Sequence, residues 1–174
     1  MRTLSLILTL LVLNATARAE NAKGFVEKFF GSKDNYSIIF EVDRATVYRI
    51  HFPKDSKNPK RPDLRRVGKV YEYTVGESSQ LSGDIMDKFR KLITHPRIDD
   101  PDSAKGCIPT YGIRVRCQKG DNIVDINLCF ECDIMVASDG KKVIGSSDFD
   151  SIHVNLVNLI KPLFPQDKII QQLK

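Results

Sequence analysis

Residues 111–136, YGIRVRCQKGDNIVDINLCFECDIMV, decide the fold of this chain. Apolar and polar residues alternate on both sides of Gly120-Asp121, a period that is typical of β-strands. A two-residue turn with glycine first is the signature of a type II′ hairpin. Closing the hairpin there pairs apolar with apolar residues: Cys117 with Val124, Val115 with Ile126, Ile113 with Leu128 and Tyr111 with Phe130. A shift by one residue would turn one apolar set to solvent, so this register is well specified.

The four cysteines all fall within this region, between residues 107 and 132. The alternation from Val124 to Val136 predicts one long strand, on which Cys129 and Cys132 face opposite sides. Their Cα atoms would then lie ~10 Å apart, beyond the ~7 Å that a disulfide tolerates. Continuing the register makes Cys107 a diagonal neighbour of Cys132. We therefore expect a Cys107–Cys132 disulfide first and a Cys107–Cys129 disulfide second.

The cysteines allow two alternatives to a structural disulfide: a zinc site and a redox-active pair of thiols. Zinc could be held by Cys107, Cys129 and Cys132 together with His95, although the paired knuckles of common zinc sites are missing. Alternatively, a bulge at residues 129–132 could bring the C-x-x-C thiols together for redox chemistry, since the predicted strand is longer than usual. Cys117 lies at the other end of the hairpin, and we expect it to be a small core residue.

The rest of the chain predicts an α+β domain. We expect helices near 25–30, 82–94 and from about residue 149, with strands near 36–42, 48–52 and 71–75 and three more from the hairpin onward. Pro162 and Pro165 should bend or end the last helix. Serine-bearing turns at 76–79 and 145–147 would precede the two later helices, and a duplicated unit is conceivable. The predicted order is α-βββ-α-βββ-α, a mostly antiparallel sheet of about six strands with helices packed on one face.

The first 19 residues have the features of a cleavable export signal. A basic start is followed by the apolar run Leu4 to Leu13 and by Ala17-Arg18-Ala19, an A-x-A cleavage site before Glu20. Ten apolar residues span about 15 Å, half of a hydrocarbon core, so an anchor is the weaker interpretation. We expect a secreted or periplasmic single domain over residues 20–174, with no transmembrane segment after cleavage.

Residues 53–69, PKDSKNPKRPDLRRVGK, predict a basic loop that contains Lys60, Arg61, Arg65 and Arg66. One hypothesis is a weak contact with phosphate, acidic polysaccharide or an anionic surface. A solvated loop is the plainer interpretation, because no aromatic residues interleave to stack on bases or sugars. Removing residues 1–19 takes away Arg2 and Arg18 and lowers the net charge from +5 to about +3, which is too small to indicate nucleic-acid binding.

No pattern in the sequence indicates an enzyme. The three histidines are scattered, and no nucleophile motif, metalloprotease motif or phosphate-binding loop is present. Asp148 and Asp150 are explained as acids at a helix start. We therefore expect a non-enzymatic structural or binding domain without a cofactor, stapled by a disulfide. The alternative is a thiol-redox or zinc-binding protein.

One resemblance agrees with export. The stretches CIPTYGIRVRC and VDINLCFECDI, with the later Asp148-Phe149-Asp150, resemble an uncharacterised family of exported bacterial proteins. The similarity covers about residues 105–165, and its most specific part is Cys129-Phe130-Glu131-Cys132. It implies a bacterial, extracytoplasmic protein, and it implies no activity, cofactor or partner.

Overall fold

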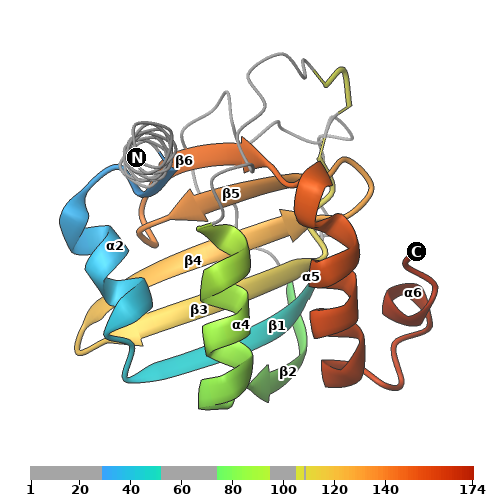
Figure 1. Ribbon diagram of the computed structural model, residues 1–174, viewed down its shortest axis with the longest axis horizontal. Coiled ribbons are helices and arrows are strands. Elements are labelled where there is room, and N and C mark those ends of the chain that lie inside the picture. Colours follow the sequence, from blue (N-terminus) through green and yellow to red (C-terminus); the bar gives the residue numbers. More distant parts are fainter. Residues whose placement is uncertain (1–28, 52–73, 95–104, 108) are drawn as a thin grey trace, which may run out of the picture.

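The predicted hairpin lies in the middle of a six-stranded antiparallel sheet (Figure 1). The computed structural model describes residues 29–51, 74–94, 105–107 and 109–174. Its strands are β1 Arg44–His51, β2 Thr74–Gln80, β3 Ile113–Lys119, β4 Asn122–Cys129, β5 Ile134–Ser138 and β6 Val143–Asp148. They are arranged in the order β2-β1-β3-β4-β5-β6, so β3 to β6 form a meander of consecutive strands and β1 joins its β3 edge.

The register of the hairpin is confirmed. Cys117 pairs with Val124, Val115 with Ile126 and Ile113 with Leu128. Gly120 has a φ of +55°, the positive value that the first position of a II′ turn needs and that glycine tolerates. Beyond these pairs the prediction was wrong: Tyr111 precedes β3, and Phe130 lies in a turn after β4.

The predicted long strand is in fact two strands. β4 ends at Cys129, and β5 starts at Ile134, which pairs with Cys129. The chain reverses over residues 130–133, where Asp133 has a φ of +52°. Aspartate tolerates this left-handed conformation better than most residues, so a turn can form without glycine. Because the turn preserves the alternation of apolar and polar residues, periodicity alone could not reveal it.

Helix α2 replaces a predicted strand. Helix α2 spans Lys33–Phe40, and the Ser32 side chain caps it by accepting a hydrogen bond from the Asn35 amide over 3.2 Å. The expected strand over 36–42 rested on alternation, but adjacent Ile38 and Ile39 are both buried. Burial of neighbours suits one face of a helix, and the cap at Ser32 supplies the missing start signal.

Two predicted turns are strands. Residues 76–79 lie inside β2 and residues 145–147 lie inside β6, so the idea of a repeated unit ending in serine turns is wrong. In the described residues the order is α-ββ-α-ββββ-αα, and six strands are reached by a different division of the chain. The α+β class with an antiparallel sheet is confirmed.

The later helices agree with the expected positions. Helix α4 spans Gly83–Ile93, and its apolar face buries Met86, Phe89 and Ile93. Helix α5 spans His153–Ile160 after a short 3-10 turn at Asp150–Ile152. The chain leaves α5 through a second 3-10 turn, Lys161–Leu163, which contains Pro162, and ends with α6 Lys168–Gln171. In Figure 1, α2, α4 and α5 lie over the same face of the sheet.

The main core fills the space between this face and the helices. Its strand residues include Val47, Val115, Ile126 and Met135, all buried. A smaller apolar cluster lies on the other side of the sheet and contains Ile50, Tyr111, Cys129, Cys132, Ile134 and Val136. Among the described residues, no helix has the length and apolar character needed to cross a membrane.

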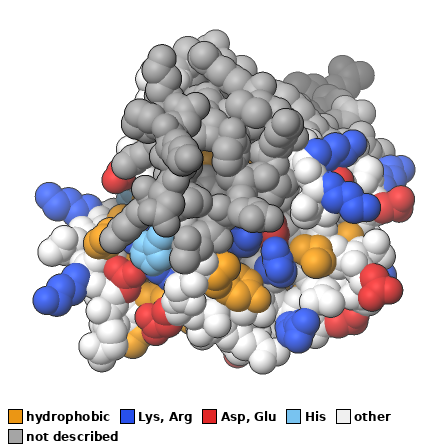
Figure 2. Space-filling model, turned by 180° about the vertical axis from the view of Figure 1, so that it is seen from behind, with side chains coloured by type: hydrophobic (Ala, Val, Ile, Leu, Met, Phe, Trp, Pro, Cys, Tyr) orange, Lys and Arg blue, Asp and Glu red, His pale blue; other side chains and the backbone are white. Residues whose placement is uncertain are grey.

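The side of the molecule seen in Figure 2 carries Lys and Arg side chains beside Asp and Glu side chains in its described part.

Within the sheet, polar residues of β3 and β4 pair with each other. Arg116 donates two hydrogen bonds to Asp125, over 2.7 and 2.8 Å, and Arg114 donates one to Asn127 over 2.9 Å. Arg114, Asp125 and Asn127 are buried, so this row of polar contacts is part of the folded structure.

Candidate functional site

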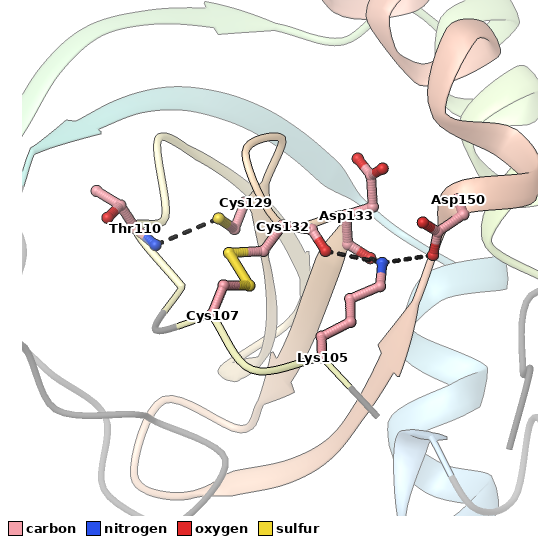
Figure 3. The surroundings of a disulfide bond; sticks show 7 residues. All are labelled: Lys105, Cys107, Thr110, Cys129, Cys132, Asp133 and Asp150. Carbon is pink, nitrogen blue, oxygen red and sulfur yellow. Dashed lines mark hydrogen bonds and ion pairs between the residues drawn. A yellow bond between two sulfur atoms is a disulfide. The ribbon is translucent and has the colours of Figure 1, made fainter. Parts of the chain in front are cut away.

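The cysteine turn, residues 129–133, is the first candidate site (Figure 3). Cys132, in this turn between β4 and β5, forms a disulfide with Cys107, which precedes β3; their Cα atoms lie 6.3 Å apart. This is the pairing ranked first from the sequence, although Cys132 reaches Cys107 from a turn and not from a continuous strand. The disulfide therefore holds the segment before β3 against the β4–β5 turn.

The two remaining cysteines lie on different sides of the sheet. Cys129 is buried in the smaller cluster, where its Sγ accepts a hydrogen bond from the Thr110 amide over 3.2 Å. Burial raises the pKa of the Cys129 thiol, although nearby backbone amides oppose the shift. Cys117 is buried in the main core, and burial raises the pKa of its thiol to about 12. Both side chains are thus protonated thiols at neutral pH.

The four sulfur atoms do not meet at one point. In the described part of the chain, no group of three or more His, Cys, Asp or Glu side chains could hold a metal ion. Cys107 and Cys132 are joined to each other, which leaves Cys129 as the third member of the expected zinc set. His95, the fourth expected ligand, lies outside the described residues.

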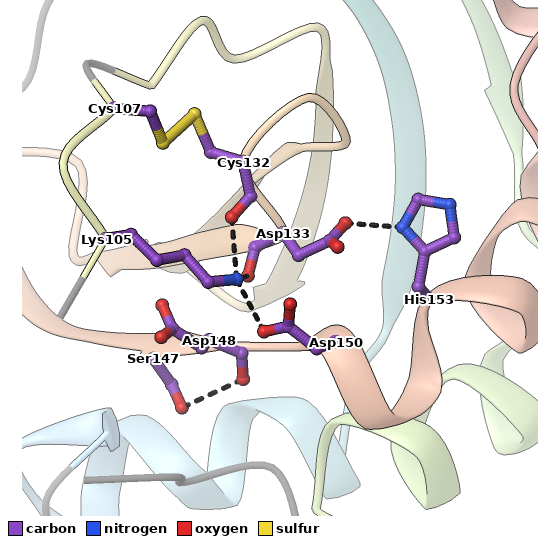
Figure 4. A network of polar contacts seen from close by, with 8 residues as sticks. All are labelled: Lys105, Cys107, Cys132, Asp133, Ser147, Asp148, Asp150 and His153. Carbon is purple, nitrogen blue, oxygen red and sulfur yellow. Dashed lines mark hydrogen bonds and ion pairs between the residues drawn. A yellow bond between two sulfur atoms is a disulfide. The ribbon is translucent and has the colours of Figure 1, made fainter. Parts of the chain in front are cut away.

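Lys105 connects the cysteine turn to the residues that precede α5 (Figure 4). Its ammonium donates to the carbonyl oxygen of Cys132 over 2.8 Å and forms an ion pair with Asp150 at the start of the last helical region. The Asp133 carbonyl accepts a further hydrogen bond, from the Phe149 amide over 2.7 Å. These contacts link the disulfide-bonded turn to the segment that leads into α5.

Among the residues that the structure describes, His153 and Asp133 form a pair that resembles part of a catalytic triad. Nδ1 of His153 contacts the carboxylate of Asp133, as Figure 4 shows, and Nε2 lies 2.7 Å from the backbone oxygen of Lys174. The ring of Phe130 packs edge-on against the imidazole, and that of Phe149 stacks on it. In a catalytic triad, Nε2 would face a nucleophilic hydroxyl or thiol. Here it faces a main-chain oxygen of Lys174, which has no proton to give.

The groove between α4 and α5, which we call the helix groove, is the second candidate site. It is an open groove with a volume of about 540 Å³, and it is lined by Lys88, Lys91, Leu92, Asn155, Asn158 and Leu159. Each helix contributes three residues at positions i, i+3 and i+4, which share one face of a helix. The leucines are half-buried, whereas the lysines and asparagines are exposed. The volume is in the range of small-molecule sites.

The sequence analysis did not identify the helix groove. Leu92 and Leu159 are partly buried, and both pack against the main core. The signal that could have found the groove is a shared pattern, Lys88-x-x-Lys91-Leu92 in α4 and Asn155-x-x-Asn158-Leu159 in α5. Only the packing of α4 beside α5 turns the two patterns into one site.

Several predicted sites fall outside the described residues. The anion-contact residues Lys60, Arg61, Arg65 and Arg66 lie in the segment 52–73, and the export signal lies in 1–28. The basic loop and the signal cleavage after Ala19 therefore stay predictions.

The comparisons with known proteins identify no relative. The chain matches no family model, no curated protein and no solved structure. The resemblance to exported bacterial proteins is consequently still a prediction, and any function has to be inferred from the geometry of the chain itself.

Proposed function

We propose that this chain is an exported, non-enzymatic binding domain held together by the Cys107–Cys132 disulfide. The observation that carries the proposal is the position of this disulfide, which joins the segment before β3 to the β4–β5 turn. Structural disulfides persist in oxidising compartments and are rare in the cytosol. A disulfide of this kind agrees with the export signal that residues 1–19 predict.

The geometry around His153 supports a non-enzymatic role. Asp133 and His153 are arranged like the base and its orienting carboxylate, but Nε2 faces the Lys174 backbone oxygen. The contact attaches Lys174 to the start of α5. A binding role is supported by the helix groove, whose polar side chains face solvent above two leucines.

Intact-mass analysis of protein recovered from an oxidising compartment tests the proposal. We expect a chain that begins at Glu20, has lost two mass units to one disulfide, and gains two alkyl groups only after denaturation. Peptide mapping should place the bond between Cys107 and Cys132. Four alkylated thiols without reduction, or a chain that retains residues 1–19 and stays in the cytosol, would contradict it.

Thiol exchange is the second candidate function, because Cys129, the last residue of β4, immediately precedes the turn that contains Cys132. In such a step the Cys129 thiolate would attack Sγ of Cys132, form a Cys129–Cys132 disulfide and release Cys107 as a thiolate. Burial opposes the step by raising the pKa of Cys129. Peptide mapping after incubation at pH 7 and pH 10 separates the candidates: a Cys129–Cys132 peptide at pH 7 favours exchange, and its absence at both values favours the staple.

A further inference from the structure

We propose that the helix groove binds an amphiphilic anion: a single alkyl chain with a phosphate or carboxylate head group. This inference rests on the proposed binding function and names its ligand class. Its basis is the composition of the six lining residues, in which two cationic and two amide side chains surround two leucines.

The lysines have charge available for a ligand. Within the described part of the chain, Lys88 and Lys91 make no ion pair or side-chain hydrogen bond. Their neighbour Arg90 differs, because it pairs with Asp87 and donates to the Ile39 carbonyl over 2.7 Å. None of the six lining residues is an acid. The lysine side of the groove is therefore an unneutralised positive edge, which favours an anion.

The opposite wall offers neutral hydrogen-bonding groups. Asn155 and Asn158 of α5 are exposed and, among the described residues, form no side-chain hydrogen bond. Each amide carries two donors and one acceptor, so the pair can bind head-group oxygen atoms without adding charge. Helix α5, HVNLVNLI, contains no acidic residue that would repel an anion.

The floor of the groove selects for an apolar portion of the ligand. Leu92 and Leu159 lie one on each helix and are only half-buried, so part of their apolar surface stays in contact with water. Covering that surface with methylene groups is favourable by the hydrophobic effect. A head group alone would leave the floor uncovered, and an uncharged chain would leave the lysines unused.

A ligand panel on the full exported protein tests the inference, with every probe kept below its micelle concentration. The panel consists of dodecyl phosphate, dodecanoate, dodecyl maltoside and inorganic phosphate. Titration calorimetry measures affinity, and NMR of the Asn155 and Asn158 side-chain amides locates the site. We expect both anionic amphiphiles to bind and shift these amides, and dodecyl maltoside and inorganic phosphate to bind at least about tenfold more weakly.

Charge removal supplies the second arm. The double variant K88Q/K91Q should weaken dodecyl phosphate binding about tenfold, because two charge contacts are lost. The matched control K141Q/K142Q removes two exposed lysines from the turn between β5 and β6, outside the groove, and should leave affinity unchanged. If K88Q/K91Q does not fold, the ligand panel and the amide shifts of the native protein still show whether the helix groove binds an amphiphilic anion.

Three results would overturn the inference: equal affinity for dodecyl maltoside and dodecyl phosphate, amide shifts away from Asn155 and Asn158, or self-association through the groove without ligand. The mass analysis described above keeps the two proposals apart. An intact Cys107–Cys132 bond with no amphiphile binding rejects only the ligand class. Binding by a protein with four alkylated thiols rejects only the disulfide staple.

Discussion

Nε of Arg49 donates a hydrogen bond to Oδ2 of Asp167 over 2.7 Å and so joins strand β1 to the cap of α6, 118 residues further along the chain. Arg49 is buried, and its Nη1 also donates to the Gly112 carbonyl over 2.7 Å. Asp167 caps α6 by accepting from the amides of Ile169 and Ile170. One carboxylate therefore holds both the last helix and a buried arginine.

Substituting Asp167→Asn should lower the free energy of unfolding at pH 7 by about 1–3 kcal/mol, since Arg49 loses a charged partner while a capping oxygen remains. Burial alone would raise the pKa of Asp167, but the Ile170 amide and the Arg49 guanidinium outweigh it and lower that pKa below its ordinary 3.8. The ionised carboxylate of Asp167 therefore adds to the free energy of unfolding. This contribution is fully present above pH 3.8, and it is lost as the pH falls through the lower pKa that Asp167 has in the folded protein. Thermal melts should show that the difference in melting temperature between the parent and Asp167→Asn shrinks as the pH falls below 3.8.

Removing Asp125 should be more costly. Its carboxylate is almost fully buried and accepts two hydrogen bonds from Arg116, with Arg114 Nε at 3.8 Å. Asp125→Ala removes the buried carboxylate that pairs with Arg116 and lies beside Arg114, and breaking a buried ion pair typically costs about 3–5 kcal/mol. Urea unfolding should show this loss, whereas Asp121→Ala in the exposed hairpin turn should stay within about 0.5 kcal/mol of the parent. Equal effects of the two substitutions would refute the role assigned to Asp125.

The disulfide should contribute to stability through the unfolded chain. It links residues with a sequence separation of 25, for which chain entropy predicts about 3 kcal/mol. The variant C107A/C132A should therefore unfold at lower denaturant concentration than the parent, and reduction should destabilise the parent but not the variant. C129A is the matched control, because it removes a sulfur from the same turn and keeps the bond. A reductant that lowers the stability of both proteins equally would rule out this contribution.

Gly145 should tolerate no side chain. A Cβ at this position would lie 2.0 Å from the Phe29 carbonyl oxygen and 2.8 Å from the Phe29 Cα, so backbone would have to move. We expect Gly145→Ala to destabilise the protein by about 2 kcal/mol or more. Gly83→Ala is the control: a Cβ there meets no atom within 4 Å, and alanine favours the helix that begins at Gly83. Thermal denaturation compares the two, and a neutral Gly145→Ala would refute the close approach.

The central hairpin was predictable because two independent signals agreed. Gly120 fixed the turn, and the apolar period fixed which residues pair. At Asp133 only one signal existed, since the turn contains neither glycine nor proline and the alternation continues through it. The Cys107–Cys132 pairing was consequently expected for a partly mistaken reason: Cys132 approaches Cys107 because the chain turns there.

The misassigned helix α2 shows a conflict between local patterns. Tyr36, Ile38 and Phe40 alternate as strand residues do, but Ser32 is a good N-cap, and α2 contacts β3 and β4. Tertiary packing decided between them. The helix groove shows a different limit, because Lys91 and Asn158 become part of one site only through the contact of α4 with α5.

The strand order has a consequence for how the covalent link can be made during folding. β3, β4 and β5 are neighbours both in the chain and in the sheet, and both bonded cysteines belong to this short stretch. Contacts between segments that are close in sequence form early, because little chain has to be ordered first. The disulfide can therefore form within residues 105–138 before β1 and β2 have joined the sheet, and β1 then pairs with a β3 edge that is already covalently held.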